Sequence, residues 1–150
     1  MTSRSGAALS CALVVATVGL SGPALAQVPT PESVLGFVPG ADFEIATYEP
    51  SVDYYQRLAA ASDRITMLRV GRTSEGRDWW VAFVSSPENL ADIERYRGIA
   101  DAVAHPADLT DEAALDLARQ GKAIVDISGG LHASEVAGAQ HMLGLAYELV

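Results

Sequence analysis

The chain has 150 residues, which suits one small domain, and its formal net charge at pH 7 is −9. So acidic a chain is a poor partner for nucleic acid and for anionic membranes. Its one cysteine, Cys11, lies within the first 26 residues, so the rest of the chain has no disulfide and is held together by packing or by a metal.

The first 26 residues have the pattern of a secretory signal peptide. Arg4 gives a positively charged start, residues 7–20 form an apolar run, and Ala-Leu-Ala at residues 24–26 is a small-residue cleavage site. A membrane anchor is the alternative, but a span needs about 20 apolar residues, and Ser-Gly-Pro interrupts this run. We expect cleavage before Gln27 and a secreted or periplasmic protein that no longer contacts the membrane. Without Arg4, 9 of the 10 basic side chains remain against 19 acidic ones, a net charge of −10.

The chain up to residue 85 predicts a lead-in, a helix and a hairpin. Residues 27–47 begin with a stretch rich in Pro and Gly and predict an extended lead-in. Pro50 opens a helix over residues 50–61, because proline is tolerated at an early helical position. Two apolar strands follow over residues 64–70 and 78–85, and the short polar loop between them predicts a hairpin.

The next segment predicts two helices with clear ends. Ser86, followed by proline, is a strong helix start, and His105, also followed by proline, ends that helix as a surface loop residue. Thr110 caps a second helix with acidic side chains in its first turn, and Gly121 ends it.

The most apolar run outside the leader is residues 123–127. The surrounding segment, residues 122–128, predicts a central strand that is apolar on both faces and covered by helices on both sides. Asp126 interrupts it, and a buried carboxylate needs a partner. It therefore either faces a loop end or orients a histidine next to a metal. A last helical pattern runs from Val136 to Val150.

The sequence GGLHASE at residues 129–135 joins the predicted strand to the last helix. His132 and Glu135 thus lie at the carboxyl end of a strand, where α/β proteins place functional side chains, and residues three apart share a helical face. An imidazole and a carboxylate suit zinc, whose catalytic sites often use two His and one Glu with a water. The spacing alone also fits a solvated helix start. His141 lies half a turn from His132 and does not join the pair.

The stretch around His132 and Glu135 resembles the metal-binding motif of the zinc carboxypeptidases of the His-x-x-Glu type. Residues 71–77, Gly-Arg-Thr-Ser-Glu-Gly-Arg, look like the Gly-x-(Ser/Thr)-x-Glu-Gly-Arg turn of the same family, where the turn is mainly a structural signature. The two stretches occur in the family's order with a helical segment between them. The resemblance covers about residues 48–150.

This resemblance implies an α/β fold with three layers, helix–sheet–helix, around a mixed central sheet. It implies that His132 and Glu135 are the first two zinc ligands of a metallocarboxypeptidase that acts on a peptide or peptide-like substrate. In that family the third ligand, the general base and the arginines that grip the substrate lie downstream of the motif. We therefore expect residues 48–150 to be the front part of a truncated catalytic domain, which contains no general base and is inactive alone.

Two other functions fit the same residues. A zinc amidohydrolase or deacylase, or a cell-wall peptide amidase, keeps the metal site and changes the substrate. A non-catalytic binding domain keeps only the fold. A further His and Glu downstream in the full gene would count against the binding domain.

Overall fold

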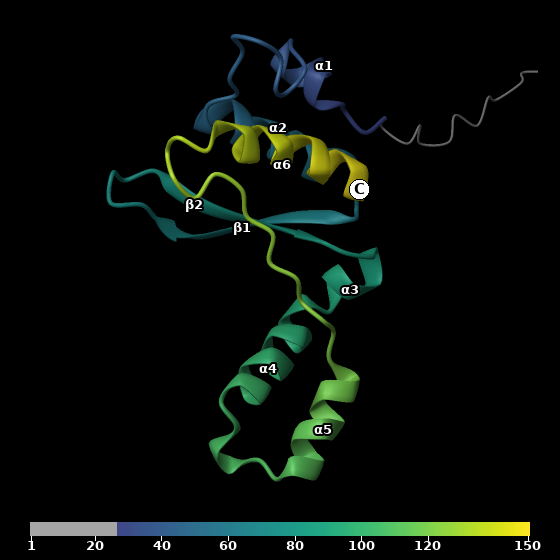
Figure 1. Cartoon of the computed structure of the whole chain (residues 1–150). Coiled ribbons are helices and arrows are strands. Elements are labelled where there is room, and N and C mark those ends of the chain that lie inside the picture. Colours follow the sequence, from purple (N-terminus) through teal and green to yellow (C-terminus); the bar gives the residue numbers. More distant parts are fainter. Residues whose placement is uncertain (1–26) are drawn as a thin grey trace, which may run out of the picture.

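The computed structural model describes residues 27–150, and the predicted signal peptide lies outside this part of the chain (Figure 1). Within it the chain forms six α-helices, one short 3-10 helix and two strands. The α/β class is confirmed, and the described residues form one antiparallel sheet of two strands. No helix between residues 27 and 150 is long and apolar enough to cross a membrane.

The lead-in contains a short helix, α1 (Pro31–Leu35), where the sequence predicted extended chain. Thr30 caps this helix, because its hydroxyl accepts a hydrogen bond from the Ser33 amide at 3.2 Å. Proline occupies the first helical position, and Gly36 ends the helix at φ +82°. The prediction was wrong here because a Thr-Pro pair starts a helix as readily as it breaks one.

Helix α2 (Tyr48–Ala61) and the hairpin of β1 (Ile65–Arg72) and β2 (Asp78–Val84) follow as the sequence predicted. The strands pair antiparallel along their length, with one irregularity between Arg69 and Gly71. Such a bulge increases the local twist of a hairpin. Helix α2 packs on β1 and so covers one face of this small sheet.

The core lies between α2, the hairpin and the last helix, α6 (Val136–Leu149). Figure 1 shows α2 and α6 side by side over the same face of the sheet. Six buried apolar residues form the core: Ala46, Tyr54, Leu58, Ile65, Leu143 and Ala146. Each large side chain among them contributes roughly 1.5–3 kcal/mol by leaving water, so the core fixes α6 to the body of the molecule.

A second group of helices projects away from the sheet (Figure 1). Helix α3 (Pro87–Ala91) begins at Ser86, as predicted, and leads into α4 (Ile93–Ala104). The sequence predicted one continuous helix, but the structure divides it at Asp92, whose φ of −101° and ψ of 16° are not helical. Aspartate favours such boundaries because its side chain competes for backbone hydrogen bonds.

The returning helix of this projection is α5 (Asp111–Gln120), which packs against α4 after the 3-10 helix Pro106–Asp108. The predicted cap is confirmed, because the Thr110 hydroxyl accepts a hydrogen bond from the Ala113 amide at 3.2 Å. Local cap chemistry therefore sets the start of this helix.

The strand predicted over residues 122–128 is wrong for the described chain. This segment has no regular secondary structure, and its apolar side chains are solvent-exposed, at 67% for Ile124, 76% for Val125 and 53% for Ile127. A strand needs a neighbour for its backbone groups, and residues 27–150 offer none beside it. Asp126 is likewise exposed, so it does not need the partner that a carboxylate buried in a central strand would require.

Candidate metal centre

His132 and Glu135 lie on a tight turn that leads directly into α6. The Glu135 amide donates a hydrogen bond to the His132 carbonyl at 2.9 Å, and Glu135 is the N-cap residue of the helix. Gly130 precedes the turn at φ +77°, a left-handed conformation that favours glycine. The sequence placed the pair on a helical face, and the structure corrects this, because a spacing of three also spans a β-turn.

The two side chains contact each other. His132 Nδ1 lies 2.6 Å from Glu135 Oε1, and the His132 backbone amide donates to Glu135 Oε2 at 3.0 Å. Both side chains face solvent, 71% exposed for His132 and 49% for Glu135. The pKa of the Glu135 carboxyl is lowered, first by the hydrogen bond from the His132 side chain and then by the one from the His132 backbone. The carboxylate is therefore ionised at neutral pH.

This pair fits two positions of a zinc site. Nitrogen and oxygen ligands of a tetrahedral zinc lie about 3.4 Å apart, since each bond is about 2.1 Å long. To bind one zinc ion, His132 Nδ1 and Glu135 Oε1, which lie 2.6 Å apart, would have to separate by less than about 1 Å. Catalytic zinc normally takes three protein ligands, and among residues 27–150 no group of three or more candidate ligand side chains exists.

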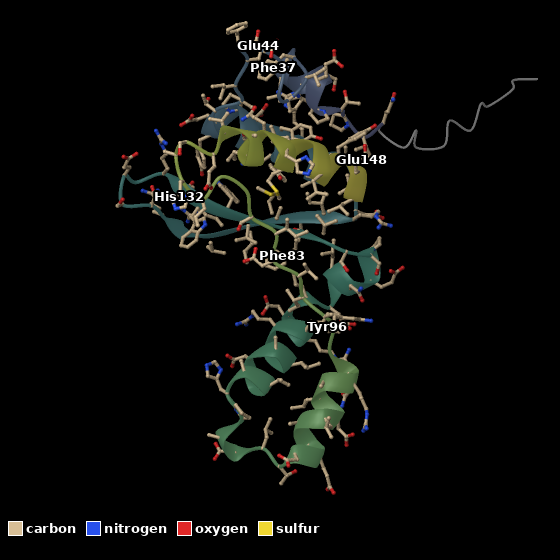
Figure 2. The ribbon with its side chains drawn as sticks, in the orientation of Figure 1. Phe37, Glu44, Phe83, Tyr96, His132 and Glu148 are labelled. Atoms are coloured by element: carbon tan, nitrogen blue, oxygen red, sulfur yellow. The ribbon has the colours of Figure 1, made fainter. Side chains whose placement is uncertain are left out.

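His105 and His141 lie elsewhere, as predicted, and so does Glu148, the one carboxylate side chain that follows Glu135 in the sequence. His105 ends α4 and contacts Asp101, with Nδ1 3.1 Å from a carboxylate oxygen. His141 is exposed on α6, one position past the buried Gln140. Figure 2 shows His132 and Glu148 toward opposite ends of α6. None of these three groups joins the His132–Glu135 pair.

The residues that support the turn were missed by sequence reasoning. Gln140 on α6 is buried, and its side chain amide bonds to both backbone groups of Ala46, at 2.9 Å and 3.0 Å. Gly138, also on α6, lies against the backbone of Gly129 and Gly130. Glycine inside a helix is costly and often marks a close approach of another backbone, so Gly138 was the available signal. Nothing in the local sequence indicated the partner of Gln140.

The Gly-Arg-rich stretch at residues 71–77 is the turn of the hairpin. The Thr73 amide donates to the Arg77 carbonyl at 2.8 Å, and Gly76 takes φ +82°. Arg77 lies over the ring of Tyr48 at 5.8 Å, and Asp78 pairs with Arg69 and Arg72 on the opposite strand. These contacts are structural, as the sequence favoured.

A comparison with protein families finds a match over most of the described residues. A model described as zinc carboxypeptidase matches residues 52–150, which is more than half of the chain. No curated protein and no solved structure matches the chain. The matched span holds both the hairpin turn and the His132–Glu135 turn, in the order that the resemblance implied. The chain belongs to the zinc carboxypeptidase family.

Proposed function

We propose that this chain is the front part of an exported zinc-dependent metallocarboxypeptidase, and that His132 and Glu135 are two of its metal ligands. The observation that carries the proposal is the 2.6 Å contact between His132 Nδ1 and Glu135 Oε1 inside the family-matched span. Two ligand atoms of the types that zinc prefers are thus already close together, on a turn held next to a helix that is anchored in the core.

Each residue of the pair has a defined part in this proposal. Glu135 is ionised because its hydrogen bonds lower the pKa of the carboxyl, so it offers a negative oxygen at neutral pH. His132 would offer a neutral ring nitrogen to the metal, and because a metal binds the deprotonated forms of both side chains, its binding would compete with protons. When bound, zinc supplies a Lewis acid that polarises a peptide carbonyl and activates water.

A continuation of the domain after residue 150 is part of the same proposal. It is supported by the apolar side chains of residues 122–128, which are exposed although their composition suits a strand covered on both faces. Further strands and helices would cover them and supply a third ligand, a general base and substrate-binding groups. We also propose cleavage before Gln27, on the pattern of residues 1–26; N-terminal sequencing of secreted protein should begin at Gln27.

The first experiment measures metal binding by the full chain. Cobalt(II), which stands in for zinc and is paramagnetic, is titrated while NMR signals of the histidine rings are followed. We expect the ring signals of His132 to shift first, and His132→Ala and Glu135→Gln each to weaken binding by at least about tenfold. His105→Ala and His141→Ala are matched controls that should leave binding unchanged. Equal binding by His132→Ala and His141→Ala would remove the pair from the mechanism.

The second experiment measures activity on peptides with free and with blocked C-termini. We expect this chain to be inactive and a version extended downstream to release C-terminal residues only from unblocked peptides, in a zinc-dependent way. His132→Ala and Glu135→Ala should abolish activity of the long form. Zinc-dependent cleavage by the short form, lost in His132→Ala, would show that the site is already complete.

A further inference from the structure

Two glycines let the loop before the metal pair lie directly against α6. A Cβ placed on Gly129 would stand 2.6 Å from the carbonyl oxygen of Gly138 and 2.8 Å from Met142 Cγ. A Cβ placed on Gly138 would stand 3.0 Å from the amide nitrogen of Gly130. Real Cβ atoms do not approach a backbone oxygen as closely as 2.6 Å, so this contact exists only between bare backbones. At Gly129 and Gly138 the loop and the helix therefore touch backbone to backbone, with the side chains of Met142 and Ala139 beside this contact.

Helix α6 is held in place from its other side. The Gln140 side chain bonds to both backbone groups of Ala46, and the Tyr55 hydroxyl donates to the Met142 carbonyl at 2.9 Å. Leu143 is fully buried in the core. These anchors do not involve residues 129–135. The helix is therefore the fixed partner in the contact, and the loop takes its position from the helix.

The metal pair has little else to orient it. The His132 and Glu135 side chains are exposed, and the Glu135 carboxylate contacts the ring and the backbone amide of His132, with a smaller contribution from the Leu131 backbone. Their direction is thus set by the backbone of the turn, which enters through Gly129 and Gly130 and leaves through α6. Because α6 fixes the end of the turn, a shift of the backbone at Gly129 changes the direction of the His132 imidazole relative to the Glu135 carboxylate.

We propose that Gly129 and Gly138 are positioning residues for the metal pair: the bare contact between them fixes the loop on α6 and so directs His132 and Glu135 toward one metal ion. The proposal rests on the proposed function, since it takes the pair as metal ligands. Neither glycine has a side chain that could contact the metal or the substrate. Each acts through the backbone of the turn.

Alanine substitutions on both sides of the contact test this, and α6 supplies a matched control. Gly129→Ala has the severe clash and Gly138→Ala the milder one, whereas a Cβ on Gly144 meets nothing within 4 Å. Gly138→Ala and Gly144→Ala both gain the same helix propensity, because alanine favours a helix over glycine. Any difference between them therefore reports the contact and not the helix.

Cobalt(II) titration of the full chain is the first readout. We expect binding to weaken by about tenfold in Gly129→Ala, the lower limit for groups that orient metal ligands, by less in Gly138→Ala, and not at all in Gly144→Ala. Circular dichroism should show that all three keep their helices. Wild-type affinity in Gly129→Ala would overturn the proposal, and if Gly129→Ala does not fold, Gly138→Ala carries the same test.

A metal-free readout separates this inference from the proposed function. The Gly130 backbone lies next to the Ala139 methyl group, so an NOE between them should be present in the wild type and in Gly144→Ala. It should be lost in Gly129→Ala. If the wild type binds no cobalt, the proposed function fails. Persistence of this NOE in Gly129→Ala overturns the positioning role whether or not metal binds.

Discussion

The buried amide of Gln140 offers the sharpest test of how α6 is held. Its Oε1 accepts from the Ala46 amide at 2.9 Å, and its Nε2 donates to the Ala46 carbonyl at 3.0 Å, across 94 positions of sequence. Both residues are buried, with 4% of Gln140 and 7% of Ala46 exposed. The substitution Gln140→Met keeps the length of the side chain and removes both hydrogen bonds, leaving two buried backbone groups of Ala46 without partners.

The expected loss follows from those two groups. Each buried donor or acceptor left unpaired costs about 1–3 kcal/mol, and the apolar methionine side chain regains roughly 1 kcal/mol by leaving water. The net destabilisation is therefore about 3 kcal/mol, a large part of the roughly 5–15 kcal/mol by which a domain is typically stable. For a chain of this size it corresponds to a drop of about 10 °C in Tm.

Urea denaturation followed by tryptophan fluorescence measures this loss, since Trp79 and Trp80 lie on β2. The matched control is Gln120→Met on α5, where the side chain is exposed and its amide donates only to the Asp116 carbonyl at 3.2 Å. We expect the control to stay within about 0.5 kcal/mol of the wild type. Equal stabilities for Gln140→Met and Gln120→Met would refute the argument that α6 is held by this pair of hydrogen bonds.

Three other predictions concern stability and solubility. Burial raises the pKa of Tyr54 to about 12, whereas an unfolded tyrosine ionises near pH ~10. The free energy of unfolding should therefore be constant below about pH 10 and fall between about pH 10 and 12. Urea titration at several pH values should show a flatter profile for Tyr54→Phe. Gly76→Ala, at φ +82° in the hairpin turn, should cost about 1–2 kcal/mol, whereas Gly98→Ala in α4, with open space around it, should be neutral or stabilising by thermal melt. Val125→Lys should reduce light scattering by aggregates without lowering Tm, because this side chain is exposed; a drop in Tm would show that it is packed.

Several features that depend on neighbouring residues were predictable from the sequence, although the short helix α1 and the break at Asp92 were missed. Ser86 and Thr110 start α3 and α5 as expected, because a cap needs only the side chain and an amide three residues later. The hairpin around Gly76 follows from two apolar strands separated by a short polar loop. The His132–Glu135 pair was found for the same reason, since both members lie within four residues.

Features that depend on distant residues were not predictable. The run around Val125 has the composition of a central strand, but a strand also needs a neighbour, and the described chain brings none beside it. Gln140 looks like an ordinary polar position on a helix, and only the fold shows that it meets Ala46. Composition indicates which residues prefer burial; it does not tell which segment buries them.

The origin of the core residues also sets an order in time. Tyr54 and Leu58 come early in the chain, whereas Leu143 and Ala146, which complete their surroundings, come after the whole α3–α5 projection. During synthesis the contacts between the two strands of the β-hairpin, and those between α4 and α5, can form soon after these elements emerge, and such local structures form within microseconds. The core cannot form before α6 has been synthesised. Bringing α6 back to α2 closes a long loop, so we expect this docking to be the slow step. A nascent chain that has reached Gly121 therefore contains a hairpin and helices that are at best marginally stable, because the core residues of α6 are still missing.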